Sequence, residues 1–321
     1  MLVYIIIFLG SFTLTYLIKN YYIKHALLEE VNERSSHTVA TPHGGGIAIA
    51  FTWFIGLCYL NYAGEIEDSL LFALLMGILI SVVSFFDDLY DLSPKVRLIA
   101  QAGVASGGLY FLGGFDTLDF YFFTIKNQIF TNLFAFFLIV WFINLYNFLD
   151  GINAYAGSEM IFLSLGGFLL FGGAHFFVLI AATLGFLVWN YGNAKIFMGD
   201  VGSTLLGYNV AIFTLYYANE NTQNFWIWII LFGIFWFDAT YTLLRRKLNG
   251  EKLSQAHKKH AYQRLTQAGF SHSEVVLLSI IVNFILFGLI YFVTNIFLAF
   301  VIALIVLSVW IKYINYKKDF F

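Results

Sequence analysis

Charged residues, prolines and cysteines are all scarce in this chain of 321 residues. Only 11% of the residues are charged, against about 25% in soluble domains, and 60% are hydrophobic. A single soluble core cannot hide so much apolar surface, so the surrounding solvent must be lipid. The single cysteine, Cys58, excludes a disulfide within the chain and suggests no thiolate metal site.

The two prolines and the long apolar runs favour α-helices over a β-barrel, which would show short segments of alternating polarity. Eleven runs are candidate membrane spans: 1–18, 45–63, 69–86, 96–114, 128–146, 157–172, 175–191, 203–218, 224–243, 274–293 and 295–311. Ten is the alternative count, because two of the runs are short. The sequence therefore predicts an all-α, polytopic integral membrane protein that forms a single domain over residues 1–321.

Basic residues are distributed unevenly between the two sides of these spans. If successive loops alternate sides, all of the 17 lysines and arginines except Lys126 fall on one side. The loop 63–68 on the opposite side holds three acidic residues and no basic one. Because basic loops stay in the cytoplasm, this asymmetry predicts an outside N-terminus and a cytoplasmic C-terminus.

Adjacent carboxylates end the predicted span 69–86 without a polar spacer. Asp87 and Asp88 follow the apolar run, and a continued helix would bring Asp91 within one turn of both. Carboxylates close to hydrocarbon are costly, and like charges repel unless a cation joins them. Taken alone, the stretch suits a binding site and an acidic loop start equally well.

Four more polar clusters fall on the same predicted cytoplasmic face: 35–46 with its three consecutive glycines, 144–154, 190–203 and 256–264. Each has a simple structural explanation when taken alone, namely a flexible loop, a helix cap or a basic patch that attracts acidic lipids. Asp200, flanked by glycines, is a good N-cap but also suits a hard cation. His257, His260 and Arg264 would share one helical stripe, which favours anion binding over zinc.

Together, the five clusters indicate a site that holds a divalent cation and a polyanion at the cytoplasmic membrane surface. Carboxylates bind magnesium, and magnesium with lysine and arginine binds phosphates. The membrane setting adds a lipid substrate, so phosphoryl transfer between a nucleotide and a lipid is indicated. The rival functions are a transporter or flippase for a lipid-linked sugar, which would bind near the bilayer midplane, and a non-catalytic scaffold.

From about His37 to Arg264 the chain resembles the polyprenyl-phosphate N-acetylhexosamine-1-phosphate transferases. The most specific motifs are Asp87-Asp88, Asn147-Phe148-Leu149-Asp150-Gly151 and Ala194-Lys195-Ile196-Phe197-Met198-Gly199-Asp200-Val201-Gly202-Ser203. The resemblance implies that a UDP-N-acetylhexosamine and undecaprenyl phosphate give undecaprenyl-diphospho-sugar and UMP in the bacterial cytoplasmic (inner) membrane. It also implies a need for Mg²⁺, which Mn²⁺ can replace, contact with membrane lipids but not with nucleic acid, and compatibility with a homodimer.

The resemblance implies roles for individual residues as well. Asp200 is the implied magnesium ligand, and Asp87 and Asp88 are the implied catalytic pair, of which the first would take a proton from the lipid phosphate. The implied substrate-binding residues are Asn147, Asp150, Lys95, Lys195, Asn190, His257, His260, Arg264, Thr41 and Gly45. The roles of Asp91, Asp238 and His43 stay open, and Asp238 suits a site carboxylate and a structural hydrogen bond equally.

The segment 257–264 lacks the three consecutive histidines of the peptidoglycan enzyme phospho-N-acetylmuramoyl-pentapeptide transferase, which is the alternative member of the family. It is similar to transferases that start O-antigen or capsule chains, so the expected donor carries GlcNAc or a 6-deoxy relative. Two routes are open, direct attack by the lipid phosphate and a two-step route through an aspartyl-phosphate. Inversion at a chiral β-phosphorus would exclude the second route, and retention would exclude the first.

Overall fold

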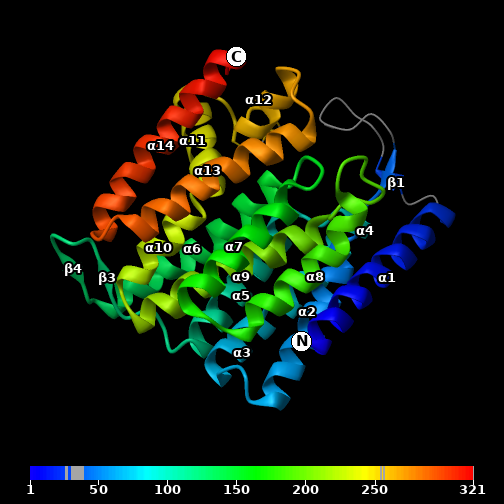
Figure 1. The fold of residues 1–321 in the computed structure, drawn as a ribbon, viewed down its shortest axis with the longest axis horizontal. Helices are drawn as coiled ribbons and strands as arrows, with labels where there is room; N and C mark the ends of the chain where they lie inside the picture. Colours follow the sequence, from blue (N-terminus) through cyan, green and yellow to red (C-terminus); the bar gives the residue numbers. More distant parts are fainter. Residues whose placement is uncertain (26–27, 30–39, 254, 256, 321) are drawn as a thin grey trace.

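The computed structural model describes residues 1–25, 28–29, 40–253, 255 and 257–320, and its architecture is almost entirely α-helical (Figure 1). The helices are α1 (Leu2–Lys24), α2 (Gly46–Ala63), α3 (Asp68–Leu75), α4 (Gly77–Tyr90), α5 (Pro94–Phe111), α6 (Gln128–Leu149), α7 (Tyr155–Phe171), α8 (Ala174–Asn190), α9 (Asp200–Glu220), α10 (Gln223–Leu231), α11 (Gly233–Leu248), α12 (Ala261–Gln267), α13 (His272–Phe292) and α14 (Ile296–Lys317). Two short antiparallel pairs join β1 (Leu28–Glu29) to β2 (Thr41–Pro42) and β3 (Leu118–Asp119) to β4 (Thr124–Ile125). The predicted all-α class is confirmed.

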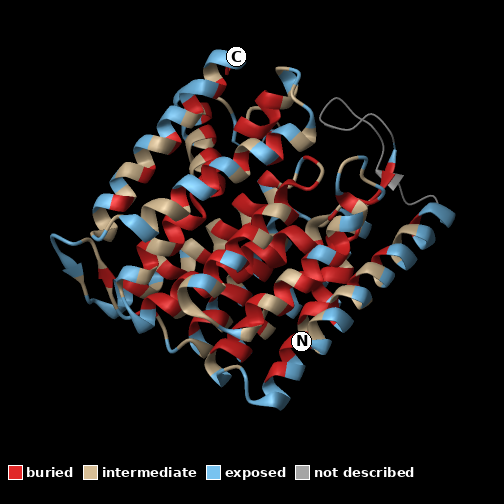
Figure 2. Cartoon of the chain, viewed as in Figure 1, coloured by how far each residue is buried: buried red, intermediate tan, exposed pale blue. Residues whose placement is uncertain are grey.

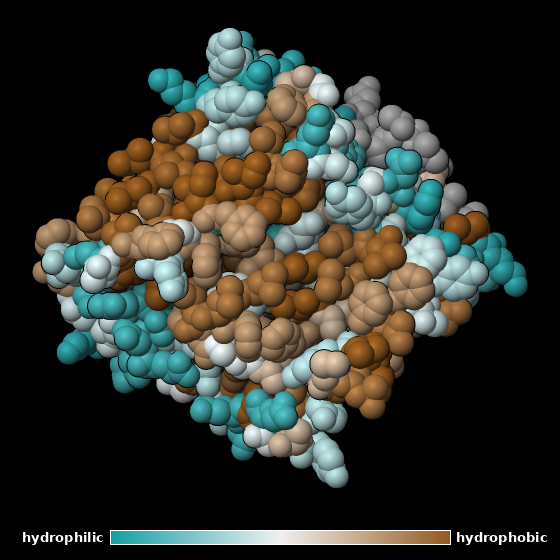
Figure 3. Space-filling model, in the orientation of Figure 1, coloured by the Kyte–Doolittle hydropathy of each residue, from teal (hydrophilic) through white to brown (hydrophobic). Residues whose placement is uncertain are grey.

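Every predicted span falls on a helix or on a pair of consecutive helices. Within the described residues, six helices are long and apolar enough to cross a membrane, or seven if α10 and α11 form one bent span. Figure 3 shows an apolar belt that runs across the molecule between two polar edges. The protein is therefore a multi-pass membrane protein, while the total of eleven spans and their orientation stay predictions.

The predicted span 224–243 is not one straight helix. α10 and α11 are bent by 76° on either side of Phe232. At Gly233 an added Cβ would lie 2.8 Å from a leucine of α13, so the backbone approaches that helix closely. The Trp236 indole N–H donates to the Ile229 carbonyl oxygen at 2.7 Å, which satisfies a carbonyl next to the break. No proline marks this bend, which instead lies beside a glycine that packs closely on α13.

Helix α9 lies at the centre of the fold, and almost all of its residues from Val201 to Ala218 are buried (Figures 1 and 2). Glycines allow its neighbours to come close, as is usual between membrane helices. An added Cβ at Gly207 would lie 2.5 Å from the carbonyl oxygen of Phe142 on α6. Gly202 meets Gly46 of α2 in the same way. The N-terminus of α9 is therefore held firmly between α2, α4 and α6.

A buried acid–amide pair joins α7 to α13. Glu159 is 3% exposed, and its Oε2 accepts a hydrogen bond from Asn283 Nδ2 at 2.6 Å. We expect Glu159→Gln to retain this bond, because the new amide oxygen is also an acceptor. Glu159→Leu leaves the Asn283 donor unsatisfied and should lower the free energy of unfolding by about 1–3 kcal/mol more than Glu159→Gln does. Thermal unfolding in detergent measures the difference, and equal stability of the two variants would contradict the pairing.

Candidate active site

A cavity of about 440 Å³ lies at the ends of α4 and α6 and the starts of α5 and α9. Its charged and amide walls include Asp87, Arg97, Asn147 and Asp200. Its apolar wall is formed by Ile80, Val83, Pro94, Leu98, Phe148 and Leu253. Three of the polar clusters that the sequence places on one face therefore meet at a single cavity, which has polar and apolar sides.

Asp200 is the first residue of α9, and α6 fixes its carboxylate. Asn147 Nδ2 donates to Asp200 Oδ1 at 2.8 Å and lies 2.9 Å from Ser203 Oγ. Gly199 has a φ of 74°, which lies in the left-handed region that glycine adopts readily. An added Cβ at this glycine would lie 3.1 Å from Asp88 Oδ2, so a larger residue would crowd the site. The local backbone thus places Asp200 next to a second carboxylate.

The acidic stretch of α4 contributes two carboxylates to this arrangement. Asp87 is 8% exposed, its Oδ2 lies 3.2 Å from Arg97 Nη1, and its Oδ1 accepts the Leu92 N–H at 2.8 Å. Asp88 Oδ1 accepts the backbone N–H of Asp200 at 3.4 Å. The structure therefore places Asp87, Asp88 and Asp200 near one another, although Asp88 is not among the residues that line the cavity, and their catalytic roles stay predictions.

The continued helix that would bring Asp91 to the other two carboxylates is not present. Helix α4 ends at Tyr90, and Asp91 follows it with a left-handed φ of 48° and an exposed side chain. The helical spacing that would return Asp91 to the other two carboxylates does not apply beyond that point. A C-terminal cap, which is one of the ordinary places for such a conformation, explains the break.

The carboxylates fit a magnesium ion that is shared with a substrate. Among the described residues, no group of three or more His, Cys, Asp or Glu side chains could hold a metal ion by itself. Mg²⁺ usually binds one or two carboxylates and completes its octahedron with water and substrate phosphates. Asp200 and Asp88 supply that number, and Asp87, Arg97 and His43 are close enough to act on Asp200 electrostatically.

The glycine segment before α2 binds the loop before α9 through its backbone. The Gly45 N–H donates to the Phe197 carbonyl at 2.9 Å, and the Phe197 N–H donates to the Pro42 carbonyl at 2.8 Å. Gly45 is predicted to bind substrate, but its backbone amide is hydrogen-bonded within the protein. Thr41, which is also in the predicted binding set, is buried. Positions 35–39 of this cluster lie outside the described residues.

Only Asn147 of the ten predicted substrate-binding residues lines the cavity, and those outside its lining include Asp150, Asn190, Lys95 and Lys195. Asn190 is buried, and its amide accepts from the Ala154 N–H at 2.7 Å and donates to the Ile196 carbonyl at 2.9 Å. Asp150 follows α6 as its C-cap, and both lysines are exposed. The geometry of Asn190 indicates that it holds two loops together, while the binding roles of all four stay predictions.

The predicted helical stripe of His257, His260 and Arg264 is wrong. Helix α12 begins at Ala261, so both histidines precede it, and Arg264 Nη1 instead donates to Asn315 Oδ1 at 2.5 Å. Asp238 on α11 sets this start, because both of its carboxylate oxygens accept the Ala261 N–H, at 2.8 and 2.9 Å. Asp238 Oδ1 also lies 3.6 Å from His260 Nδ1. These contacts are those of a structural hydrogen-bond acceptor.

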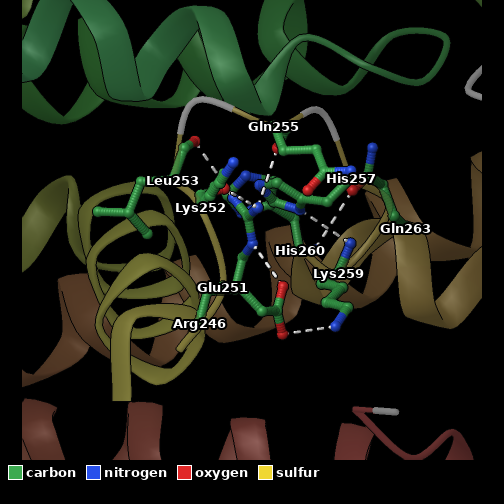
Figure 4. Close-up of polar contacts among 9 residues, drawn as sticks. All are labelled: Arg246, Glu251, Lys252, Leu253, Gln255, His257, Lys259, His260 and Gln263. Carbon is green, nitrogen blue, oxygen red and sulfur yellow. Dashed lines mark hydrogen bonds and ion pairs between the residues drawn. The ribbon is translucent and has the colours of Figure 1, made fainter. Parts of the chain in front are cut away.

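Arg246 of α11 forms the centre of the loop before the histidines (Figure 4). Its guanidinium is 2% exposed and donates to the backbone carbonyls of Lys252, Leu253 and Gln255. Its Nε lies 3.0 Å from Glu251 Oε2. Leu253 also lines the cavity, so this loop connects the cavity wall to the histidine segment.

Glu251 and His257 have shifted pKa values in this loop. The hydrogen bond from Lys259 to Glu251, at 2.7 Å, holds the pKa of Glu251 below its usual range, with Arg246 adding to the effect. Burial, together with the nearby charges of His260 and Arg246, lowers the pKa of His257 to about 4. The His257 ring is therefore neutral near pH 7, and its Nδ1 accepts the backbone N–H of Lys259 at 3.2 Å.

Five polar residues that line the cavity are missing from the predicted site residues: Ser84, Arg97, Gln101, Asn144 and Thr204. Gln101 and Asn144 exchange two hydrogen bonds between their amides, at 2.8 and 3.2 Å. Arg97 and Gln101 are four residues apart, so they share a face of α5. The packing of α5 decides which of its faces turns toward the cavity, so no local sequence signal separates Arg97 from the neighbouring Lys95.

Comparison with known proteins shows to which family the chain belongs. A model of the glycosyl transferase family 4 matches residues 70–218, which include Asp87, Asn147 and Asp200. The chain is 32% identical over 303 residues to a probable undecaprenyl-phosphate N-acetylglucosaminyl 1-phosphate transferase of Bacillus subtilis (strain 168), covering 88% of this chain and 81% of the relative.

Two further relatives carry related names. An undecaprenyl-phosphate alpha-N-acetylglucosaminyl 1-phosphate transferase of Salmonella typhi is 29% identical over 311 residues, with 88% of this chain and 80% of the relative covered. A decaprenyl-phosphate N-acetylglucosaminephosphotransferase of Mycobacterium tuberculosis (strain CDC 1551 / Oshkosh) is 28% identical over 291 residues, with 77% and 70% covered. The chain therefore belongs to the polyprenyl-phosphate N-acetylhexosamine-1-phosphate transferase family.

Proposed function

We propose that the protein transfers N-acetylhexosamine 1-phosphate from a UDP-sugar to undecaprenyl phosphate at the cytoplasmic face of the bacterial inner membrane. The products are undecaprenyl-diphospho-sugar and UMP, and the reaction starts a cell-envelope polysaccharide. One observation carries the proposal, namely the cavity in which Asp87, Asp200 and Arg97 face an apolar wall. The relatives' names support the acceptor, because they specify undecaprenyl or decaprenyl phosphate.

Both proposed substrates are anionic, so the site must offset their mutual repulsion. Arg97 lines the cavity with a guanidinium, which matches phosphate geometry, and the N-terminus of α9 adds the positive end of the helix dipole. Asp200 and Asp88 would hold the magnesium ion. When bound, the ion would polarise the donor diphosphate and stabilise the charge on the departing UMP.

The position of Asp87 suits a role in activating the acceptor phosphate. Its contacts with Arg97 and with the Leu92 amide hold the carboxylate at the cavity wall. We assign it to orient or deprotonate the acceptor phosphate, whose oxygen then forms a bond to the sugar-bearing β-phosphorus. The bond between that phosphorus and the bridging oxygen breaks, and UMP leaves with the oxygen. The fixed position favours this direct route by reducing the entropy cost of attack.

The direct test is turnover by the purified protein in detergent with Mg²⁺, undecaprenyl phosphate and a panel of UDP-sugars. We expect UMP release with one N-acetylhexosamine donor, and none with UDP-N-acetylmuramoyl-pentapeptide. A chelator should stop the reaction, and added Mg²⁺ or Mn²⁺ should restore it, because the diphosphate needs the ion for charge compensation. Absence of UMP release with every donor would refute the proposed activity.

A further inference from the structure

Three cationic side chains from different parts of the chain lie close to the aromatic ring of Phe320. This residue lies just beyond the end of α14, which reaches α11 and α12 (Figure 1), and it is only 3% exposed. The centroid of its ring lies 4.2 Å from Arg245 Cζ, 5.3 Å from Lys259 Nζ and 5.4 Å from Arg264 Cζ. All three distances lie within the range of about 6 Å over which a ring face attracts a cation.

Polar contacts strengthen the same junction between α11, α12 and the end of α14. Asn315 Oδ1 accepts hydrogen bonds from Arg264 Nη1 at 2.5 Å and from Arg245 Nη1 at 3.3 Å. Arg264 is 1% exposed, and its Nε and Nη2 have no hydrogen-bond partner within the described part of the chain. The Phe320 ring therefore compensates in part for the burial of this guanidinium. Without the ring, three like charges would lie near one another with less to offset their repulsion.

The junction includes Lys259, which lies between His257 and His260. Lys259, which contacts the ring, also pairs with Glu251 at 2.7 Å and donates its backbone N–H to His257. Glu251 in turn pairs with Arg246, around which the loop carrying Leu253 to the cavity is folded. A continuous set of contacts thus leads from Phe320 to both the histidines and the cavity wall.

We propose that Phe320 is a positioning residue that holds Lys259 and α12 through its ring, and so fixes the histidine loop (residues 257–260) for binding of the sugar nucleotide. The inference rests on the proposed function, and it assigns to donor binding the loop whose two histidines the family resemblance implies as substrate-binding residues. A ring that only fills space would affect overall stability. A positioning ring affects the donor KM and depends on the aromatic face.

The test compares substitutions at Phe320 in the full chain. Phe320→Ala should raise the KM for the UDP-sugar about three- to tenfold, with kcat and the KM for undecaprenyl phosphate within about twofold of wild type. Trypsin should cut faster after Lys258 and Lys259. Phe320→Trp should restore wild-type behaviour, because its ring also binds cations, and Phe320→Leu should fall between the two. Tyr316→Ala is the matched control, since that aromatic residue is 85% exposed.

Three results would overturn the proposal. The first is a wild-type donor KM and tryptic pattern in Phe320→Ala, and the second is full rescue by Phe320→Leu. The third is a lower melting temperature and a lower kcat together with higher KM values for both substrates, which would indicate a general structural role. If the wild-type protein transfers no sugar phosphate at all, the proposed function fails. The tryptic comparison of the Ala, Leu and Trp variants then still decides whether the ring holds the loop.

Discussion

Replacing Asp200 with asparagine should lower kcat by about 10³-fold while the protein stays folded. The new amide keeps an oxygen that can accept the 2.8 Å hydrogen bond from Asn147, so the contact between α6 and α9 survives. What the substitution removes is the negative charge at the point where two carboxylates meet the N-terminus of α9. UMP release measures the rate, and elution as a single peak in size-exclusion chromatography measures the folded yield.

The matched control for this substitution is Asp91→Asn. Asp91 belongs to the same acidic stretch, but its side chain is exposed and its backbone has a left-handed conformation. Asparagine adopts that conformation readily. We expect a wild-type rate from this variant, because its charge lies outside the cavity wall. Wild-type turnover and unchanged magnesium dependence in Asp200→Asn would remove Asp200 from the metal site.

The helices and the main carboxylates could be predicted because both follow from local sequence. Long apolar runs with few prolines have no alternative to helices in lipid. Asp87 and Asp200 stand at the ends of such runs, where a charge is costly and therefore informative. Their meeting at one cavity is compatible with the shared side of the loops that the lysine and arginine asymmetry predicts.

What could not be predicted depends on contacts between distant segments. The start of α12 is set by Asp238, which lies 23 residues before Ala261, so the helical spacing of the histidines was misleading. The 76° bend at Phe232 arises where α11 packs on α13. The choice between Lys95 and Arg97 depends on the rotation of α5 about its axis, which packing decides.

Arg97→Gln should reduce kcat/KM about 100-fold, whereas Lys95→Gln should stay within about threefold of wild type. Arg97 is the only cationic side chain among the described residues that line the cavity, and Lys95 is exposed two positions away. Arg97→Lys should recover only part of the loss, because an ammonium cannot bind a phosphate in the bidentate manner of a guanidinium. Equal effects of the Arg97 and Lys95 substitutions would contradict the assignment.

Arg97 can act in two ways, and a double substitution separates them. It lies 3.2 Å from Asp87, so its loss also leaves a nearly buried carboxylate without its ion-pair partner. If Arg97 acts only through Asp87, then Asp87→Asn with Arg97→Gln should be no slower than Asp87→Asn alone. If Arg97 also binds a substrate phosphate, the double variant should be slower still, with the added loss in the KM of one substrate. We expect the second result, because the Arg97 side chain is 42% exposed and therefore accessible to an anionic ligand in the cavity.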